Sequence, residues 1–158
     1  MNVLQPAESY LTFTLDRELF AVNVTRVLEI LEIKPIVKVP MSPLFMRGVI
    51  NLRGNILPVI DARIKFGMAD TPFTIDSCII VMGIGSGKDP LLVGILVDSV
   101  REVIEIRQAD IQSSTGIGAF CNSELIVGMG NTGNSFAMIL EPDKVFAADD
   151  LIILAAAS

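Results

Sequence analysis

The sequence contains no histidine, no tryptophan and only two cysteines among its 158 residues. Without an imidazole, the chain lacks the side chain that most often serves as a general base or a metal ligand. Cys78 and Cys121 stand far apart in apolar surroundings, and neither has a histidine that could activate its thiol. We therefore expect buried, reduced thiols rather than a disulfide, and a protein with no catalytic residue, no metal and no cofactor.

Long hydrophobic runs and concentrated positive charge are also missing. Hydrophobic residues make up 51% of the chain, yet no apolar run approaches the roughly 18 residues that span a bilayer. The first ten residues, MNVLQPAESY, have neither the basic start nor the apolar stretch of a secretory signal, so a cytoplasmic protein without direct membrane insertion is expected. The net charge is −6, and its lysines and arginines are scattered, which argues against a nucleic-acid partner.

Two glycine-rich segments resemble phosphate-binding loops only superficially. Gly128-Met-Gly-Asn-Thr-Gly133 matches G-x-G-x-x-G, but a turn and a strand pattern follow where a helix is required. In Gly83-Ile-Gly-Ser-Gly-Lys-Asp89, Asp89 occupies the place of the Ser or Thr that would hold magnesium. Both segments are predicted to be hairpin loops.

Alternation of apolar and polar residues dominates the chain and predicts an all-β plan. In Tyr10-Leu-Thr-Phe-Thr-Leu15, every second residue is apolar, which is the period of a half-buried strand. Turn-forming residues separate the expected strands, which are 10–15, 19–24, 28–33, 49–52, 56–60, 78–83, 91–97, 102–107, 125–129 and 136–140. Short helical segments are expected after Ser42, through Met46, and from Pro142 onward.

The sequence also contains an internal repeat. Residues 20–33 (FAVNVTRVLEILEI) align without gaps on residues 93–106 (VGILVDSVREVIEI), and residues 48–66 align more weakly on 128–146. Such self-similarity predicts two small, similar β-barrels side by side.

One charged residue stands out in the stretch GVINLRGNILPVID, residues 48–61. Arg53 lies between two apolar runs, where Leu52-Arg53-Gly54-Asn55 supplies turn residues. Pro58 lacks an N–H, which suggests an edge strand or a bulge in the second run. An arginine on such a hairpin is either simply solvated or serves recognition, since arginine pairs well with carboxylates and is frequent at interface hot spots.

Residues 48–63 (GVINLRGNILPVIDAR) resemble the signature of CheW-like chemotaxis coupling proteins. A second hallmark is similar in Leu92-Val-Gly-Ile-Leu-Val-Asp98 followed by Val100-Arg-Glu-Val103, and the agreement runs from about Tyr10 to Phe146. The resemblance implies a mostly β fold in which two SH3-like five-stranded barrels share a core, with short helices including one near the C-terminus. The whole chain, 1–158, would form one CheW-like domain with pseudo-repeated barrels at roughly 10–75 and 76–142, which can exchange strands, and a C-terminal helix at 142–154.

The same resemblance implies a non-catalytic adaptor. Such proteins couple the cytoplasmic tips of methyl-accepting chemoreceptors to the regulatory domain of the histidine kinase CheA, and they are recruited to receptor arrays at the membrane. Position by position, it assigns partner binding to Arg53, Glu29, Val27, Ile56, Gly48 and Gly94. The alternative for the two glycines is a backbone requirement, and for Val27 and Ile56 it is core packing. The chain departs from the family pattern at Ala62 and in the small, glycine-rich stretch 113–122.

Three other interpretations remain open at this stage. Within the family, the protein could serve a non-flagellar chemosensory pathway. Outside it, a small-ligand-binding β-barrel could use a pocket between the barrels, or a redox enzyme could use Cys121. Neither of the last two has a convergent set of polar residues in the sequence to support it.

Overall fold

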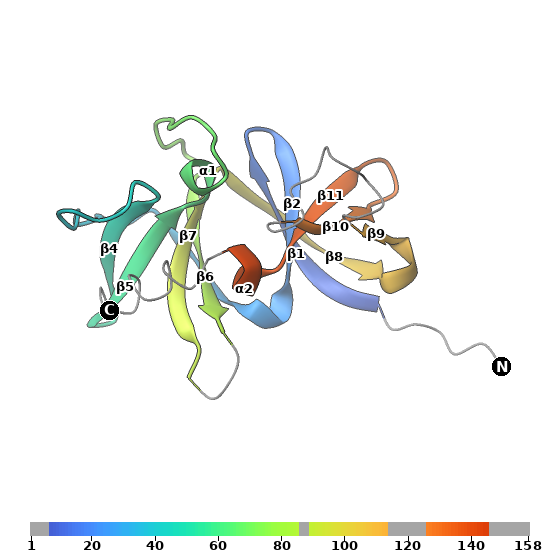
Figure 1. Cartoon of the computed structure of the whole chain (residues 1–158), viewed down its shortest axis with the longest axis horizontal. Coiled ribbons are helices and arrows are strands. Elements are labelled where there is room, and N and C mark those ends of the chain that lie inside the picture. Colours follow the sequence, from blue (N-terminus) through green and yellow to red (C-terminus); the bar gives the residue numbers. More distant parts are fainter. Residues whose placement is uncertain (1–6, 86–88, 114–125, 146–158) are drawn as a thin grey trace.

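The computed structural model describes residues 7–85, 89–113 and 126–145, which form two β-sheets that lie side by side (Figure 1). The mostly β prediction is confirmed. The strands are β1 (Ala7–Leu15), β2 (Glu18–Asn23), β3 (Val27–Glu32), β4 (Met46–Leu52), β5 (Asn55–Asp61), β6 (Cys78–Ile84), β7 (Leu91–Val97), β8 (Ser99–Arg107), β9 (Ile111–Ser113), β10 (Ile126–Asn131) and β11 (Phe136–Leu140).

The six-stranded sheet draws its strands from both ends of the chain, and the five-stranded sheet is built from the middle. One sheet has the order β8-β1-β2-β11-β10-β9 and the other has the order β3-β6-β7-β5-β4. Residues 10–75 and 76–142 therefore each contribute strands to both sheets, through the crossovers from β2 to β3 and from β7 to β8. The first sheet has six strands rather than five because Ile111–Ser113, which no pattern predicted, pairs with β10.

Strand pairing follows the same register in the two sheets. Val59 pairs in parallel with Gly94 in the five-stranded sheet, and Ile139 pairs in parallel with Ala21 in the six-stranded one. Register shifts also recur in corresponding places, between Met46 and Gly48 and between Ile126 and Gly128. The alignments match Val59 with Ile139, Ala21 with Gly94 and Gly48 with Gly128, so the repeated sequence corresponds to repeated backbone geometry.

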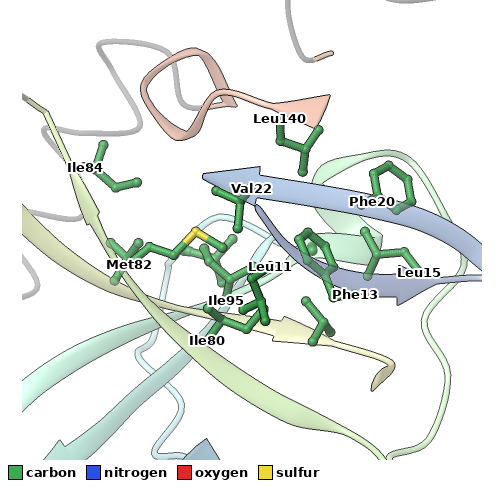
Figure 2. Packing of buried hydrophobic residues seen from close by; sticks show 14 of the residues in the cluster. Leu11, Phe13, Leu15, Phe20, Val22, Ile80, Met82, Ile84, Ile95 and Leu140 are labelled. Carbon is green, nitrogen blue, oxygen red and sulfur yellow. The ribbon is translucent and has the colours of Figure 1, made fainter. Parts of the chain in front are cut away.

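The main hydrophobic core lies between the two sheets (Figure 2). Leu11, Phe13 and Val22 from the six-stranded sheet meet Ile80 and Met82 from the five-stranded sheet, and all are at most 5% exposed. Burying a side chain of this size contributes about 1.5–3 kcal/mol, so this shared layer fixes the sheets on one another. Each sheet also encloses a smaller cluster of its own.

Helical structure is sparse among the described residues. The helix α1 (Ala62–Lys65), which was not predicted, begins where the Asp61 carboxylate accepts hydrogen bonds from the backbone N–H groups of Arg63 and Ile64. The segment after Ser42 is a turn closed by the Met46 N–H on the Pro43 carbonyl, and Ser42 donates to the Val39 carbonyl instead of capping a helix. The helix predicted from Pro142 is α2 (Pro142–Val145), and its continuation to residue 154 lies outside the described residues.

The expectation for Pro58 was wrong, because β5 is an inner strand between β7 and β4. Its parallel pairing with β7 begins at Val59, one residue after the proline, while Pro58 itself pairs only with Val49 of β4. At Pro58, β5 is therefore paired on one side only, and the missing N–H interrupts no hydrogen bond between strands. Among the described helices, none is long and apolar enough to cross a membrane.

Candidate functional site

Arg53 lies at the tip of the β4–β5 hairpin, in a turn of two residues. Arg53 and Gly54 have φ angles of 51° and 87°, both positive, as a type I′ turn requires. The Asn51 side-chain oxygen accepts a hydrogen bond from the Gly54 N–H at 2.7 Å, which stabilises the turn. The predicted turn is confirmed, and it presents the Arg53 side chain to solvent with 68% of its surface exposed.

The Arg53 side chain pairs with Glu29. Its Nη2 donates to Glu29 Oε1 at 2.7 Å, although the two residues are far apart in sequence. Glu29 belongs to β3, the first strand of the five-stranded sheet, whereas Arg53 joins the two strands at the other end of that sheet. The ion pair therefore joins opposite ends of a curled sheet.

The electrostatics of the pair are those of a partly exposed ion pair. The hydrogen bond from Arg53 and the positive charge of that residue lower the pKa of Glu29, with a smaller contribution from Lys34. Glu29 is the more sheltered partner, with 28% of its side chain exposed. At neutral pH the carboxylate is therefore fully charged, and the Arg53 guanidinium keeps free N–H donors that can bind a second carboxylate.

Exposed apolar side chains accompany this ion pair on the same sheet. Ile56 follows the turn and is 57% exposed, and Leu28 and Ile30 on β3 are 53% and 46% exposed. An arginine–carboxylate pair with apolar neighbours is suited to recognising another protein. Leu28 and Ile30 flank Glu29 and so point away from the face that carries its carboxylate. We call Arg53, Glu29 and Ile56 the hairpin surface.

The remaining predicted site residues support this part of the fold from inside. Val27 is half-buried and packs against the main core. Gly48 has a φ of 147°, and a Cβ there would lie 2.2 Å from the Val37 carbonyl oxygen. Gly94 is also buried, and a Cβ there would come within 2.7 Å of Ile79 Cγ2. Of the six predicted positions, the structure brings Arg53 and Glu29 into contact and leaves Ile56 exposed beside the same turn, while the two glycines meet backbone and packing requirements.

Two ion networks that the sequence did not single out connect the sheets. Arg26, between β2 and β3, pairs with Glu141, which precedes α2, and with Asp143, which belongs to α2. Arg63 on α1 is 8% exposed and pairs with Asp98, on the crossover from β7 to β8, at 2.6 Å. Nothing local in the sequence marks these pairs, because each joins residues that are separated by 35 positions or more.

A small apolar cavity lies between the sheets, where the sequence suggested a ligand pocket. Its volume is about 30 Å³, and Phe13, Ile60, Met82, Ile95 and Leu140 contribute to its lining. Pockets for small molecules usually measure roughly 300–1,000 Å³. The space between the sheets therefore does not suit a metabolite.

The other sequence candidates for chemistry find little support. Cys78 is half-buried, and burial raises the pKa of its thiol, so it is a poor nucleophile. Cys121, the basis of the redox alternative, lies outside the described residues. The segment 128–133 was predicted to be a hairpin loop, but residues 128–131 belong to β10, and only residues 132–133 lie in the turn that leads into the antiparallel strand β11. In the segment 83–89, Gly83 and Ile84 end β6, and residues 86–88 lie outside the described residues.

Comparison with known proteins identifies the family. The family model described as the CheW-like domain matches residues 9–150. The chain belongs to the CheW-like family.

Several curated relatives carry the name chemotaxis protein CheW. The one from Klebsiella aerogenes is 26% identical over 147 residues, which cover 93% of this chain and 86% of the relative. The one from Treponema pallidum is 30% identical over 154 residues, covering 91% and 85% of the two chains. Among solved structures, the scaffolding protein TtCheW from Thermoanaerobacter tengcongensis superposes with a TM-score of 0.80 at 29% identity, covering 92% of this chain and 96% of that one.

Proposed function

We propose that this CheW-like protein is a non-catalytic adaptor of a bacterial chemotaxis pathway. It joins the cytoplasmic tips of methyl-accepting chemoreceptors to the regulatory domain of the histidine kinase CheA. The family match over residues 9–150 and the likeness to a scaffolding protein support this role. The adaptor works in the cytoplasm and is recruited to membrane receptor arrays by these contacts.

The observation that carries the proposal at the level of residues is the exposed Arg53–Glu29 pair with apolar neighbours. A half-sheltered carboxylate holds the arginine in a fixed direction, so less conformational entropy is lost when a partner carboxylate binds it. Ile56 then offers apolar area beside the charge. Val27, Gly48 and Gly94 contribute to binding by holding the strands that carry these side chains.

A binding experiment with each partner alone tests the proposal. The purified protein is titrated with a receptor signalling fragment and, separately, with the CheA regulatory domain. We expect micromolar affinity for both, as is common for signalling contacts of modest area. Arg53→Glu should weaken binding to at least one partner by tenfold or more, because it places a second carboxylate beside Glu29.

The matched control is Arg107→Glu. Arg107 lies on the six-stranded sheet, is 60% exposed and pairs with Asp110 at 3.4 Å, so it resembles Arg53 in exposure and charge. We expect this variant to bind as the parent protein does. Absence of binding by the parent protein to both fragments would refute the adaptor role, whereas equal effects of the two variants would refute only the assignment of the hairpin surface.

The receptors that the adaptor binds determine which pathway it serves. A non-flagellar chemosensory system would use the same contacts, and binding assays with receptors of each kind distinguish the two cases.

A further inference from the structure

The strand β3, which carries Glu29, has a hydrophobic pattern that does not distinguish its two faces. Val27 is half-buried and packs against the main core, Leu31 is half-buried and packs against the cluster within the five-stranded sheet, and Leu28 and Ile30 are exposed. Val27 pairs with Met82 and Leu31 pairs with Ile79, which lie on opposite faces of β6, so both faces of β3 carry apolar side chains. When both faces of a strand are apolar, burial alone specifies its register weakly. β3 is also an edge strand, and within the described part of the chain it pairs with β6 alone.

A shift of β3 by one residue would remove Glu29 from the hairpin surface, because neighbouring residues of a strand point to opposite faces. The pairing with β6 already contains an irregularity at this place. Val27 pairs with Met82 and Glu29 pairs with Val81, so Leu28 is an extra residue in a bulge. Bulges of this kind aim the side chains beside them, and something must hold the bulge in place.

The six-stranded sheet has the same bulge, and there a hydroxyl holds it. The register of β8 against β1 shifts between Leu11 and Phe13, which leaves Thr12 opposite Glu102. Thr12 Oγ1 donates to the Glu102 carbonyl at 2.6 Å and accepts from the Glu102 N–H at 3.0 Å. Thr12 corresponds to Val81 and Glu102 to Glu29 in the repeated pairing scheme, and valine has no hydroxyl that could do the same.

In the five-stranded sheet, Arg26 binds the backbone beside the bulge instead. Its Nε and Nη2 donate to the Gly83 carbonyl on β6 at 3.1 and 3.0 Å. Its Nη1 donates to Glu141 at 2.7 Å, and Nη2 also contacts Asp143, which in turn accepts from the Gly85 N–H. Arg26 thus fixes the chain one residue before Val27 to both β6 and the segment that follows β11.

We propose that Arg26 is a positioning residue that fixes the register of β3 and thereby aims Glu29 at Arg53. The effect of this positioning on partner binding rests on the proposed function, because the Arg53–Glu29 ion pair is part of the proposed partner surface. The positioning itself is a property of the free protein. It can therefore be measured without any partner.

The test is the pKa of the Glu29 carboxyl group, followed by NMR titration of the full chain. In the parent protein this pKa is lowered by Arg53, with a smaller contribution from Lys34, and Arg26 is not among the groups that shift it. We expect Arg26→Gln to raise the Glu29 pKa toward its ordinary value and to weaken partner binding about tenfold. Arg107→Gln, which removes an exposed ion pair elsewhere, should change neither quantity.

A rescue variant separates positioning from a general loss of stability. Adding Val81→Thr to Arg26→Gln supplies the hydroxyl that Thr12 provides in the other sheet, and we expect the lowered Glu29 pKa to return. If Arg26→Gln does not fold, Arg26→Lys replaces it, since lysine keeps the charge but loses the planar fork that reaches Gly83 and Asp143 together.

Two results would overturn the inference. One is an unchanged Glu29 pKa in the Arg26 variant, and the other is a double variant in which the raised pKa persists. Failure of the parent protein to bind either partner would contradict the proposed function alone, because the titration is made on the free protein.

Discussion

Arg53 Nη2 lies 2.7 Å from Glu29 Oε1 and so connects the turn between β4 and β5 to the edge strand β3. The pair does two things at once. It joins the two ends of the curled five-stranded sheet, and it holds the Arg53 guanidinium in one orientation toward solvent. The exposed Ile56 lies beside the same turn, so this is the most informative place to alter the protein.

Arg53→Gly should separate binding from stability. The φ of 51° at this position is one that glycine adopts without strain, and Gly133 lies in the corresponding turn of the six-stranded sheet with a φ of 102°. We expect the thermal midpoint of the variant to be no lower than that of the parent protein, while affinity for the partner fragments falls about tenfold. Calorimetry and binding titration check the two halves, and a large fall in the midpoint would show that the ion pair is mainly structural.

The Glu29 carboxyl group determines how the ion pair responds to pH. Its pKa is lower in the folded protein than the ordinary value of 4.5, because Arg53 binds the charged form. The stabilisation is therefore complete above the ordinary pKa and is lost only as the pH falls through the lower folded value. We expect partner binding that depends on this pair to be flat between about pH 6 and 8, and an NMR titration to give a higher Glu29 pKa in Arg53→Gly than in the parent protein.

Gly48→Ala should be strongly destabilising. The new Cβ would lie 2.2 Å from the backbone oxygen of Val37, and the φ of 147° adds strain. Val37 and Val49 exchange two backbone hydrogen bonds at 2.8 and 2.9 Å, so this oxygen cannot move freely. We expect a loss of about 3 kcal/mol or more in unfolding free energy, measured by urea denaturation.

Gly54→Ala is the matched control for Gly48→Ala. Gly54 also has a positive φ, 87°, but a Cβ added there would have nothing within 4 Å of it. The loss of unfolding free energy in this variant should be limited to the backbone strain, about 1 kcal/mol. Equal losses at the two glycines would contradict the role given to the close approach of Val37.

Arg63→Met should destabilise the contact between the sheets. Arg63 is 8% exposed, and its Nη1 donates to Asp98 at 2.6 Å while its Nε donates to the Ala69 carbonyl at 2.9 Å. Removing it leaves Asp98 without that cation, but the Asp98 side chain is 32% exposed and regains some hydration. We expect the unfolding free energy to fall by about 2 kcal/mol, which is less than the roughly 3–5 kcal/mol lost when a fully buried ion pair is broken. Arg107→Met, measured by the same denaturation, should cost less than about 1 kcal/mol.

Much of the fold followed from local pattern. Alternation in residues 10–15 predicted β1, and the pair Arg53-Gly54 predicted the tight turn, because strand period and turn chemistry depend on neighbouring residues. The sequence missed α1, whose cap Asp61 looked like the end of a strand, and it missed β9, which is too short to show a period. Pro58 led to a wrong prediction because one strand can be an edge over part of its length and internal over the rest.

By itself, the amino-acid sequence determined that this protein has alternating strands, a repeated plan, no imidazole and an arginine in a tight turn. Only the tertiary structure decided that Glu29 lies opposite that arginine and that Arg26 and Arg63 tie the sheets together. Local features depend on residues a few positions apart, which can be compared directly along the chain. Ion pairs between distant segments depend on how the sheets curl and stack, and that is set by the packing of the whole core.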